Sequence, residues 1–183
     1  MVAFQKGDTE AFRTLHDRHS RPLLNFFFKM SYNHATAQDL TQETWFRILR
    51  YADRYKPRAT FRTFMYRVAR NLWIDLHRSR KAAPKSVSAD LRVTEEGATV
   101  GDLVESREQP QQKTIEDREA ADLIREALTS LPEPQRMVFL LAETQDLKYR
   151  EIAEILDVPV GTVKSRMNAA VTRLRGLLGH VLG

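Results

Sequence analysis

Apolar residues recur at helical spacing through two long stretches of the chain, from Asp8 to Ser79 and from about Thr114 to the end. Side chains three and four residues apart lie on one face of a helix, so this periodicity predicts amphipathic helices that pack through one side. The pattern is interrupted at Pro22, at residues 31–34 and at residues 55–59. No strand-like alternation is sustained over several residues. We therefore predict an all-α fold.

The segment between the two helical stretches differs from both in composition. Residues 81–112 have little periodicity, contain several Ser, Gly and Pro residues, and carry more acids than bases. Such a composition is typical of a linker. We predict two small domains, an N-terminal helical bundle at 1–80 and a helix-turn-helix domain at 113–183, joined by a flexible linker at 81–112.

The helix-turn-helix prediction rests on the segment YREIAEILDVPVGTVKSRMNAAVTRLR, residues 149–175. Pro159 opposes continuation of a first helix, Gly161 permits a sharp turn, and Thr162 is expected to cap a second helix. One side of the second helix is apolar, with Val163, Met167, Ala170, Val171, Leu174 and Leu177. The other side and its flanks carry Thr162, Lys164, Ser165, Arg166, Asn168, Ala169, Thr172, Arg173 and Arg175.

No acidic residue follows Val158, so the outward surface of the second helix suits a polyanion. In a helix-turn-helix the second helix enters the major groove of DNA, where its first residues reach base edges and flanking cations contact phosphates. The same pattern is compatible with a plain amphipathic hairpin that has a solvated basic face.

A second basic surface is predicted at residues 61–81, where Arg and Lys residues are dense and Asp75 is the one acid. At helical spacing Thr63, Arg67, Arg70, Ile74 and His77 point away from the apolar stripe, and Tyr66 and Trp73 lie at its boundary. Cations and aromatics beside the loop at 55–59 suit single-stranded nucleic acid, because charge follows the backbone and rings accept unstacked bases. Alternatively, the aromatics belong to the core and the arginines are only solvated.

A helix predicted at residues 35–51 has an aromatic side chain on its polar face. Its inward side is expected to hold Ala37, Leu40, Thr44, Trp45, Ile48 and Leu49, and its outward side Asp39, Gln42, Glu43, Phe46 and Arg50. An exposed aromatic in such a place is typical of a partner surface. The alternative is a helix that its own domain buries on both sides.

Composition narrows the class of protein. The 183 residues carry a formal net charge of +5, which favours a nucleic-acid or other anionic partner. The chain has no cysteine, which excludes disulfides and thiolate metal sites and fits a reducing compartment. No apolar run approaches the roughly twenty residues of a membrane span, so we expect a cytoplasmic protein without membrane insertion. His16 and His19 lack further ligands, and we predict neither a metal nor a cofactor.

Several motifs together resemble the bacterial extracytoplasmic-function sigma factors. They are GDTEAF at 7–12, DLTQETWFRILR at 39–50, FRTFMYRVARN at 61–71, and LPEPQRMVF at 131–139 followed by YREIAEILDVPVGTVKSR at 149–166. The resemblance spans nearly the whole chain. It implies a subunit of RNA polymerase that is not an enzyme, with an N-terminal domain for the minus-ten promoter element and a C-terminal domain for the minus-thirty-five element.

The resemblance also implies roles for individual residues. Asp39, Gln42, Glu43, Phe46 and Arg50 would dock on the β′ clamp helices of polymerase core. Tyr55, Lys56 and Asn71 would hold a base flipped from the melted minus-ten element, while Arg67, Arg70, Ile74 and His77 would contact the duplex just upstream. Thr162, Lys164, Ser165, Arg166, Asn168 and Arg173 would read the minus-thirty-five element, with phosphate contacts from Arg136 and Tyr149.

The same resemblance implies further contacts with the β flap of polymerase and with an anti-sigma protein that holds the chain inactive. Two departures from the family pattern stand out, because Ala169 occupies a position that usually carries arginine and the chain is short before Gly7. A stand-alone helix-turn-helix regulator is the main alternative, although we find no sensor domain or dimer interface. A helical hydrolase or metal enzyme is the other.

Overall fold

The computed structural model describes residues 1–82 and 115–179, with side chains described at 1–79 and 119–179. Its helices are α1 (Val2–Gln5), α2 (Thr9–Ser31), α3 (His34–Arg50), the 3-10 helix η1 (Ala52–Arg54), α4 (Phe61–Ala82), α5 (Ile115–Ser130), α6 (Glu133–Glu143), α7 (Tyr149–Leu156) and α8 (Val160–Leu178). Every element in these ranges is helical, which confirms the all-α prediction. The predicted linker at 81–112 lies outside the described residues, apart from its first two positions at the end of α4.

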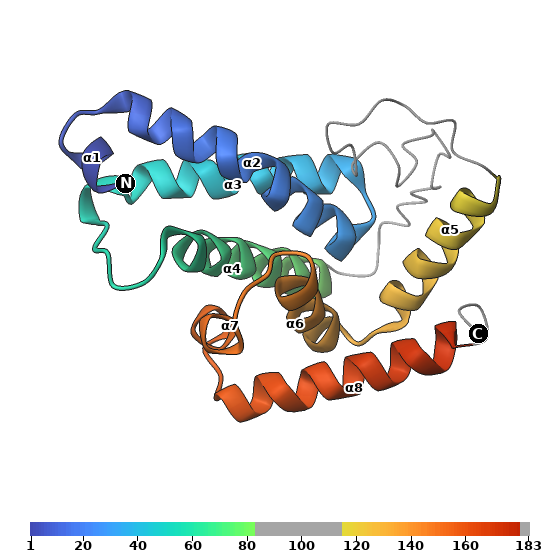
Figure 1. Ribbon diagram of the computed structural model, residues 1–183. Helices are drawn as coiled ribbons and strands as arrows, with labels where there is room; N and C mark the ends of the chain where they lie inside the picture. The colour runs from blue at the N-terminus through green and yellow to red at the C-terminus, as the bar shows by residue number, and fades with distance from the viewer. Residues whose placement is uncertain (83–114, 180–183) are drawn as a thin grey trace.

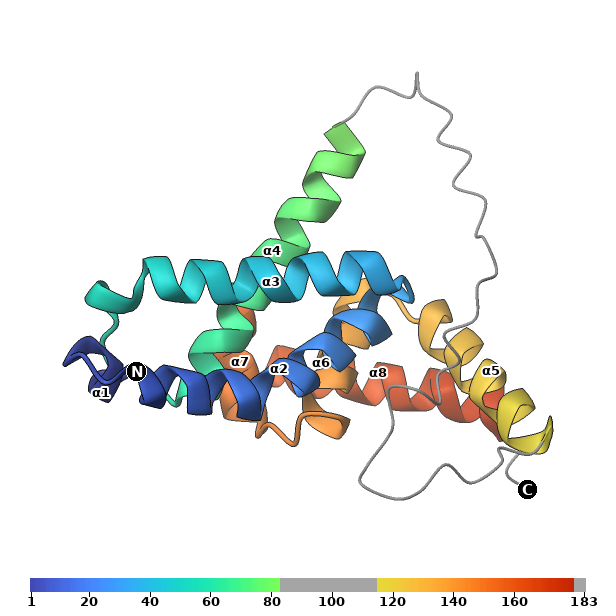
Figure 2. The same cartoon turned by 90° about the horizontal axis from the view of Figure 1, so that it is seen from above.

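The helices are stacked in layers (Figure 1). In that view α2 and α3 lie side by side at the top, α4 lies below them, α6 and α7 lie beneath α4, and α8 runs along the lower edge. The view from above shows α4 slanting across α3, with α5 packed beside the far end of α8 (Figure 2). The N-terminal half (α1–α4) and the C-terminal half (α5–α8) therefore meet mainly between α4 and α7, and α2 also contacts α5 and α6.

Side-chain caps set where the N-terminal helices begin. Asp8 Oδ1 accepts a hydrogen bond from the backbone N–H of Ala11 at 3.0 Å, and Asn33 Oδ1 accepts one from Thr36 at 2.8 Å. Each such cap stabilises a helix by about 1 kcal/mol. Between them α2 ends at Ser31, and the left-handed conformation of its C-cap residue Tyr32 (φ 48°) reverses the chain direction. The predicted interruption at residues 31–34 is therefore confirmed.

The predicted interruption at Pro22 is wrong, because Pro22 lies inside α2. A proline within a helix removes one backbone donor and clashes with the preceding turn, at a cost of about 3 kcal/mol or more. Leu23, Phe26 and Phe27 follow directly and are buried in the core. Burial of each of these side chains contributes roughly 1.5–3 kcal/mol, which offsets the cost of the proline.

The turn of the helix-turn-helix lies earlier in the chain than predicted. Asp157 adopts a left-handed conformation (φ 52°, ψ 54°) that ends α7, and Pro159 precedes the first residue of α8. Asp tolerates this conformation and proline suits a helix start, so these two residues make the turn. Gly161 and Thr162 are already helical, and Thr162 accepts a hydrogen bond from Ser165 Oγ at its carbonyl instead of capping the helix.

The two halves share one hydrophobic core. Its buried residues include Leu23, Phe26, Met65, Tyr66 and Trp73 from the N-terminal half and Met137, Val138, Leu140, Leu141, Leu147, Ile152 and Ile155 from the C-terminal half. Tyr66 and Trp73, predicted at the boundary of the α4 stripe, are only 1% and 2% exposed. Thr63, predicted to point outward, is also buried. These side chains are covered because α4 is contacted by helices from both halves.

Candidate polymerase and nucleic-acid interfaces

The outward face of α3 carries the aromatic side chain that the sequence pattern placed there. Phe46 is 55% exposed, and the Arg50 guanidinium lies 5.7 Å from the centre of its ring. Asp39 and Gln42 are exposed as well. Leu49, expected to be buried, is 42% exposed. The helix turns this side chain away from the core, so it extends the apolar surface beside Phe46.

Ion pairs of Arg47 connect polar side chains of α3 with each other and with α4. Arg47 Nε donates to Glu43 Oε1 at 2.9 Å, and Arg47 Nη1 lies 3.5 Å from Asp75 Oδ2 on α4. The hydrogen bond with Glu43 is the main cause that raises the pKa of Arg47 above its ordinary value. Glu43 is therefore half-buried and engaged within the chain, whereas Asp39 and Gln42 point into solvent.

The loop before α4 is tied to the N-terminus by a residue that sequence reasoning missed. Gln5 Nε2 donates hydrogen bonds to the carbonyls of Ala52 at 2.7 Å and Tyr55 at 2.9 Å. The Tyr55 ring packs edge-on against Phe64 with centroids 5.0 Å apart, and burial raises the pKa of Tyr55. Lys56 is exposed. A lone polar residue in a four-residue helix gives no sequence signal for such a contact.

On the role that the sequence resemblance implies for the loop at 55–59, replacing Gln5 with glutamate is expected to slow promoter opening by about three- to tenfold. The change removes a donor worth about 1 kcal/mol and places a carboxylate beside two carbonyls. The fluorescence of a 2-aminopurine base in the minus-ten element measures the opening rate. Gln38→Glu makes the same charge change at an exposed position of α3 and serves as the control. Equal opening rates for both variants would show that Gln5 does not order the loop.

Asn71 and Tyr55 lie toward the same side of α4 but are not in contact through any hydrogen bond in the described residues. Tyr55 packs on Phe64, and Asn71 is seven residues further along, which is two turns or about 10 Å of helix. Asn71 is exposed, and its Oδ1 accepts a hydrogen bond from Arg70 Nη1 at 3.1 Å. The loop and Asn71 thus form two separate ends of an open surface.

The other α4 residues predicted to contact DNA differ in exposure. Arg67 is exposed. Arg70, Ile74 and His77 are half-buried, and two of them contact the C-terminal half. Arg70 Nη2 donates to the Leu156 carbonyl at 3.2 Å, and His77 Nε2 lies 4.0 Å from Glu133 Oε2. His77 also packs on Trp73 with ring centroids 4.4 Å apart.

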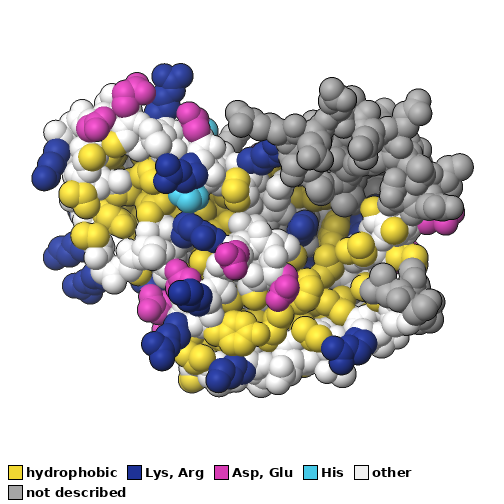
Figure 3. Space-filling model, in the orientation of Figure 1, with side chains coloured by type: hydrophobic (Ala, Val, Ile, Leu, Met, Phe, Trp, Pro, Cys, Tyr) yellow, Lys and Arg dark blue, Asp and Glu magenta, His cyan; other side chains and the backbone are white. Residues whose placement is uncertain are grey.

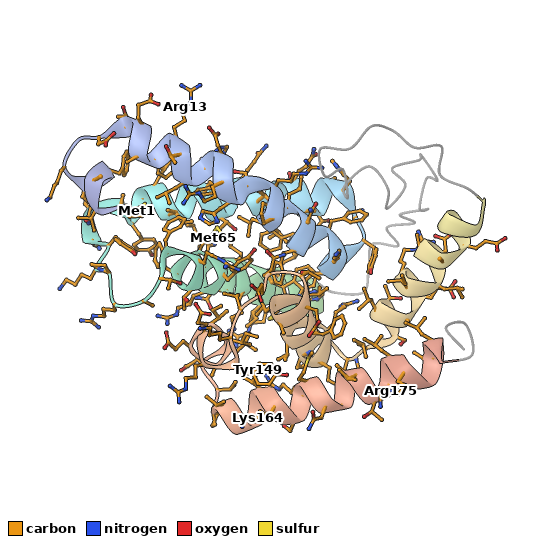
Figure 4. The ribbon with its side chains drawn as sticks, in the orientation of Figure 1. Met1, Arg13, Met65, Tyr149, Lys164 and Arg175 are labelled. Carbon is orange, nitrogen blue, oxygen red and sulfur yellow. The ribbon has the colours of Figure 1, made fainter. Side chains whose placement is uncertain are left out.

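The outward surface of α8 is open. Lys164, Ser165, Asn168, Ala169 and Arg173 are exposed, while Thr162 and Arg166 are half-buried. Val163, Met167, Ala170 and Leu174 of the predicted apolar stripe are buried. Val171 is half-buried, whereas Leu177, expected in the same stripe, is 41% exposed. Lys and Arg side chains are visible along the lower margin of the molecule (Figure 3), and Lys164 and Arg175 mark the two ends of α8 there (Figure 4).

Arg136 and Tyr149, predicted to support α8 through phosphate contacts, are both half-buried. Burial lowers the pKa of Arg136, and the nearby Tyr32 and Glu133 act in the opposite sense. Burial likewise raises the pKa of Tyr32, at the end of α2, to about 12, while Arg136 and Arg125 oppose the rise. Tyr149, the first residue of α7 (labelled in Figure 4), is half-buried and packs against the core. Arg136 therefore faces the N-terminal half as well as its own domain.

His16 and His19 serve helix packing. Their rings lie 4.9 Å from Trp45 and 5.4 Å from Phe61, respectively. Burial, with the charges of Arg18 and Arg62, lowers the pKa of His19. Within the described residues no group of three or more His, Cys, Asp or Glu side chains is placed to hold a metal ion. None of the helices described is long and apolar enough to cross a membrane.

Comparison with known proteins finds relatives of both helical parts of the chain. Residues 15–83 match the model of sigma-70 region 2, and residues 121–174 match that of sigma-70 region 4. The chain is 31% identical over 172 residues to the ECF RNA polymerase sigma factor SigW of Bacillus subtilis, covering 93% of this chain and 90% of that protein.

Two solved structures have the same fold. The sigma factor RpoE of Bartonella quintana, in complex with the anti-sigma factor NepR, has a TM-score of 0.69 at 21% identity and covers 93% of this chain and 98% of its own. CnrH, in complex with the cytosolic domain of CnrY, has a TM-score of 0.70 at 20% identity and covers 98% and 94%. On the sequence matches, this chain belongs to the extracytoplasmic-function family of RNA polymerase sigma factors.

Proposed function

We propose that this sigma factor uses three separate surfaces to start transcription. The outward face of α3 binds polymerase core, the loop at 55–59 and the exposed side of α4 bind the melted minus-ten element, and the outward face of α8 binds the minus-thirty-five element. The domains follow the predicted division into 1–80 and 113–183, joined by 81–112. As a transcription initiation factor the protein is not expected to catalyse a reaction of its own.

The exposure of Phe46 is the observation that carries this proposal. An aromatic side chain left 55% exposed at the centre of a polar helix face leaves apolar area in water. Buried in an interface, such a ring is typical of the few residues that supply most of the binding energy. Asp39, Gln42 and Arg50 surround it and supply a polar rim, while Glu43 sets the position of Arg47.

Opening of the minus-ten element follows from the chemistry beside α4. Flipping a base out of a duplex costs a few kcal/mol of stacking and pairing. Stacking on an aromatic ring returns about 1–3 kcal/mol per base, and Tyr55 is the ring in the loop that supplies it. Lys56 and Asn71 add polar contacts at exposed positions, and Arg67 contacts backbone phosphates. Strand opening is thereby coupled to sequence reading.

The α8 surface accounts for recognition upstream. Lys164, Ser165, Asn168 and Arg173 are all exposed along one side, which suits insertion of α8 into a major groove. Ala169 at the middle of this surface offers a methyl group in place of a charged side chain, so it is able to contact a thymine methyl or no base at all. Joining this modest site to the minus-ten site on one polymerase raises the effective affinity by about 10² to 10⁴.

A protein of the anti-sigma class is the proposed regulator. The sigma factor RpoE of Bartonella quintana was solved in complex with such a partner, and its fold is shared by this chain. The surfaces available to it are the α3 face and the outward side of α8. We place the protein in the cytoplasm, at the nucleoid when active, and at the membrane if its anti-sigma partner is anchored there.

Run-off transcription tests the proposal. Polymerase core is mixed with a promoter taken from the region upstream of this protein's own coding sequence, with and without the full chain. A transcript that depends on the added protein is the expected result. Absence of core binding and of transcript, together with tight binding of the free chain to duplex DNA, would favour a stand-alone helix-turn-helix regulator instead.

A further inference from the structure

Tyr51 is an exposed aromatic residue that neither the core nor the proposed interfaces use. Its side chain is 54% exposed, close to the 55% of Phe46. Within the described residues its side chain takes part in no hydrogen bond and no ring contact. A tyrosine combines an apolar ring with a polar tip, so an exposed one at a fixed point of the backbone is suited to a partner that offers both kinds of surface.

The backbone fixes the side of α3 on which Tyr51 lies. Tyr51 directly follows the last residue of α3, and its N–H still donates to the carbonyl of Arg47 at 3.0 Å. Side chains four residues apart lie on the same side of a helix, so Tyr51 shares the side of Arg47, whose Nη1 lies 3.5 Å from Asp75 Oδ2 on α4. Phe46 lies about 140° around the helix from Tyr51. Tyr51 therefore lies toward α4 and away from the α3 face proposed to bind core.

Two contacts with α4 bracket Tyr51 along the chain. Four residues before it, Arg47 meets Asp75. Four residues after it, the Tyr55 ring packs on Phe64 with centroids 5.0 Å apart. The order of the partners on α4 is reversed, so the two segments run in opposite directions, and Figures 1 and 2 show the chain turning back from the end of α3 to the start of α4. Tyr51 is at the middle of this antiparallel pair.

Asn71 has the corresponding position on α4. Phe64, Asn71 and Asp75 lie on one face of that helix, because intervals of seven and four residues are both close to whole turns. Asn71 is one turn, or about 6 Å, before Asp75, and Tyr51 is one turn after Arg47. These matched spacings place Tyr51 beside Asn71, between that residue and the loop at 55–59. The open surface that separates Asn71 from the loop therefore has an aromatic ring at its middle.

Tyr51 is better placed to receive a base than either end of this surface alone. Tyr55 is half-buried, and its ring already packs edge-on against Phe64. Asn71 offers an amide but no ring. A base that lies on Tyr51 is able to present its polar edge to Asn71 while its sugar and phosphate stay near the loop.

We propose that Tyr51 is a stacking platform for the base that leaves the duplex in the minus-ten element, with Asn71 at the polar edge of that base and Tyr55 at its flank. This inference rests on the proposed role of the loop and Asn71 in binding that element. Every base has a π-face, so stacking on a ring is tolerant of sequence. Tyr51 thus supplies affinity for the opened strand, and Asn71 supplies discrimination between bases.

Binding of the single-stranded non-template minus-ten oligonucleotide tests the role of the ring. The full chain is assembled with polymerase core at saturating concentration, and the affinity for the oligonucleotide is measured by fluorescence anisotropy. Tyr51→Ala is expected to bind roughly 5- to 150-fold more weakly, the range for loss of one base–aromatic stack. Tyr51→Phe keeps the ring and is expected to stay within about twofold of the parent chain. Ile124→Ala, at a similarly exposed apolar position of α5, is the matched control and should bind as the parent does.

Abasic oligonucleotides identify the base that Tyr51 contacts. Each base of the minus-ten strand is replaced in turn by an abasic site. At one position we expect the parent chain to lose about as much affinity as Tyr51→Ala loses on the intact strand, and Tyr51→Ala to lose nothing further there. At the other positions each abasic site should weaken the parent and the variant by the same factor. Equal losses at every position would overturn the inference, because the ring would then act on no particular base.

Three other results would also overturn it. Full affinity of Tyr51→Ala for the intact strand would exclude the ring from the minus-ten site. Weaker binding to polymerase core, with unchanged strand binding once core is saturating, would assign Tyr51 to the polymerase interface instead. A loss for Tyr51→Phe as large as that for Tyr51→Ala would show that the hydroxyl acts and the ring does not. The unfolding temperature of both variants is expected to match the parent, because the side chain is mostly in solvent.

These readouts separate failure of this inference from failure of the proposed function. If only the role of Tyr51 is wrong, the parent chain still gives core its affinity for the strand and still directs run-off transcription, and only the behaviour of the Tyr51 variants differs from expectation. If the proposed function is wrong, core binds the strand equally with and without the parent chain and no transcript depends on it. That result would overturn both.

Discussion

Phe46→Ala is expected to weaken binding of the chain to RNA polymerase core by at least about 30-fold. Truncation of an interface residue of this kind costs about 2 kcal/mol or more, and each 1.4 kcal/mol corresponds to a factor of ten. Phe46 is the exposed ring at the centre of the α3 face, with Leu49 beside it and the Arg50 guanidinium above it. The polar residues around the ring stay partly hydrated both in the free chain and in the complex with core. Removing the ring is therefore expected to weaken binding more than removing any one of them.

Fluorescence anisotropy of the labelled chain against polymerase core measures this affinity. The thermal unfolding temperature of the free variant is expected to change little, since the Phe46 side chain is mostly exposed to solvent. Ile124→Ala is the matched control, because Ile124 is an apolar side chain on α5 that is similarly exposed, at 51%. Core affinities that are equal for Phe46→Ala and the parent chain would remove the α3 face from the interface.

Asn71→Ala is expected to reduce promoter opening by roughly 5- to 150-fold while leaving core binding unchanged. A polar contact that recognises a base contributes about 1–3 kcal/mol of discrimination, and this contact forms only after the base has left the duplex. Asn71 is exposed, and the one hydrogen bond of its side chain in the described structure, from Arg70, connects neighbouring residues on the same helix. Loss of its side chain therefore acts on the opened strand and not on the fold.

Permanganate footprinting of the holoenzyme on duplex promoter measures the effect. A template with a pre-melted minus-ten region should largely restore transcription by the variant, because the stacking and pairing cost is then absent. Arg78→Ala is the control. Arg78 is exposed about one turn beyond Ile74 on α4, and this variant is expected to open the promoter as the parent chain does. Normal footprints with Asn71→Ala would show that another residue holds the flipped base.

Local sequence patterns predicted most of the helices and several surfaces. The interruption at residues 31–34 follows from Tyr32 and Asn33, which end one helix and cap the next. The burial of Val163, Met167, Ala170 and Leu174 follows from their spacing, and so does the exposure of Phe46. These features depend on periodicity and on interactions within a few residues, which a sequence carries directly.

Other features could not be predicted from local sequence patterns. Pro22 reads as a helix breaker, yet the burial of the three phenylalanines that follow it keeps α2 continuous. Leu49 fits an inward position by spacing, but the described helices leave it 42% exposed. Asp157, and not Gly161, takes the left-handed conformation, because α7 ends at Leu156 and Gly161 already lies inside α8.

By itself the sequence determined that the chain is helical, that α8 presents cations without acids, and that a polar face of α3 displays an aromatic ring. Only the tertiary structure decided that Tyr66 and Trp73 are covered, that Arg70 and His77 meet the C-terminal half, and that Gln145 and Gln5 bridge distant segments. The physical reason is that amphipathic spacing specifies one buried side of each helix. Whether a second side is also covered depends on which helices from far along the chain pack against it.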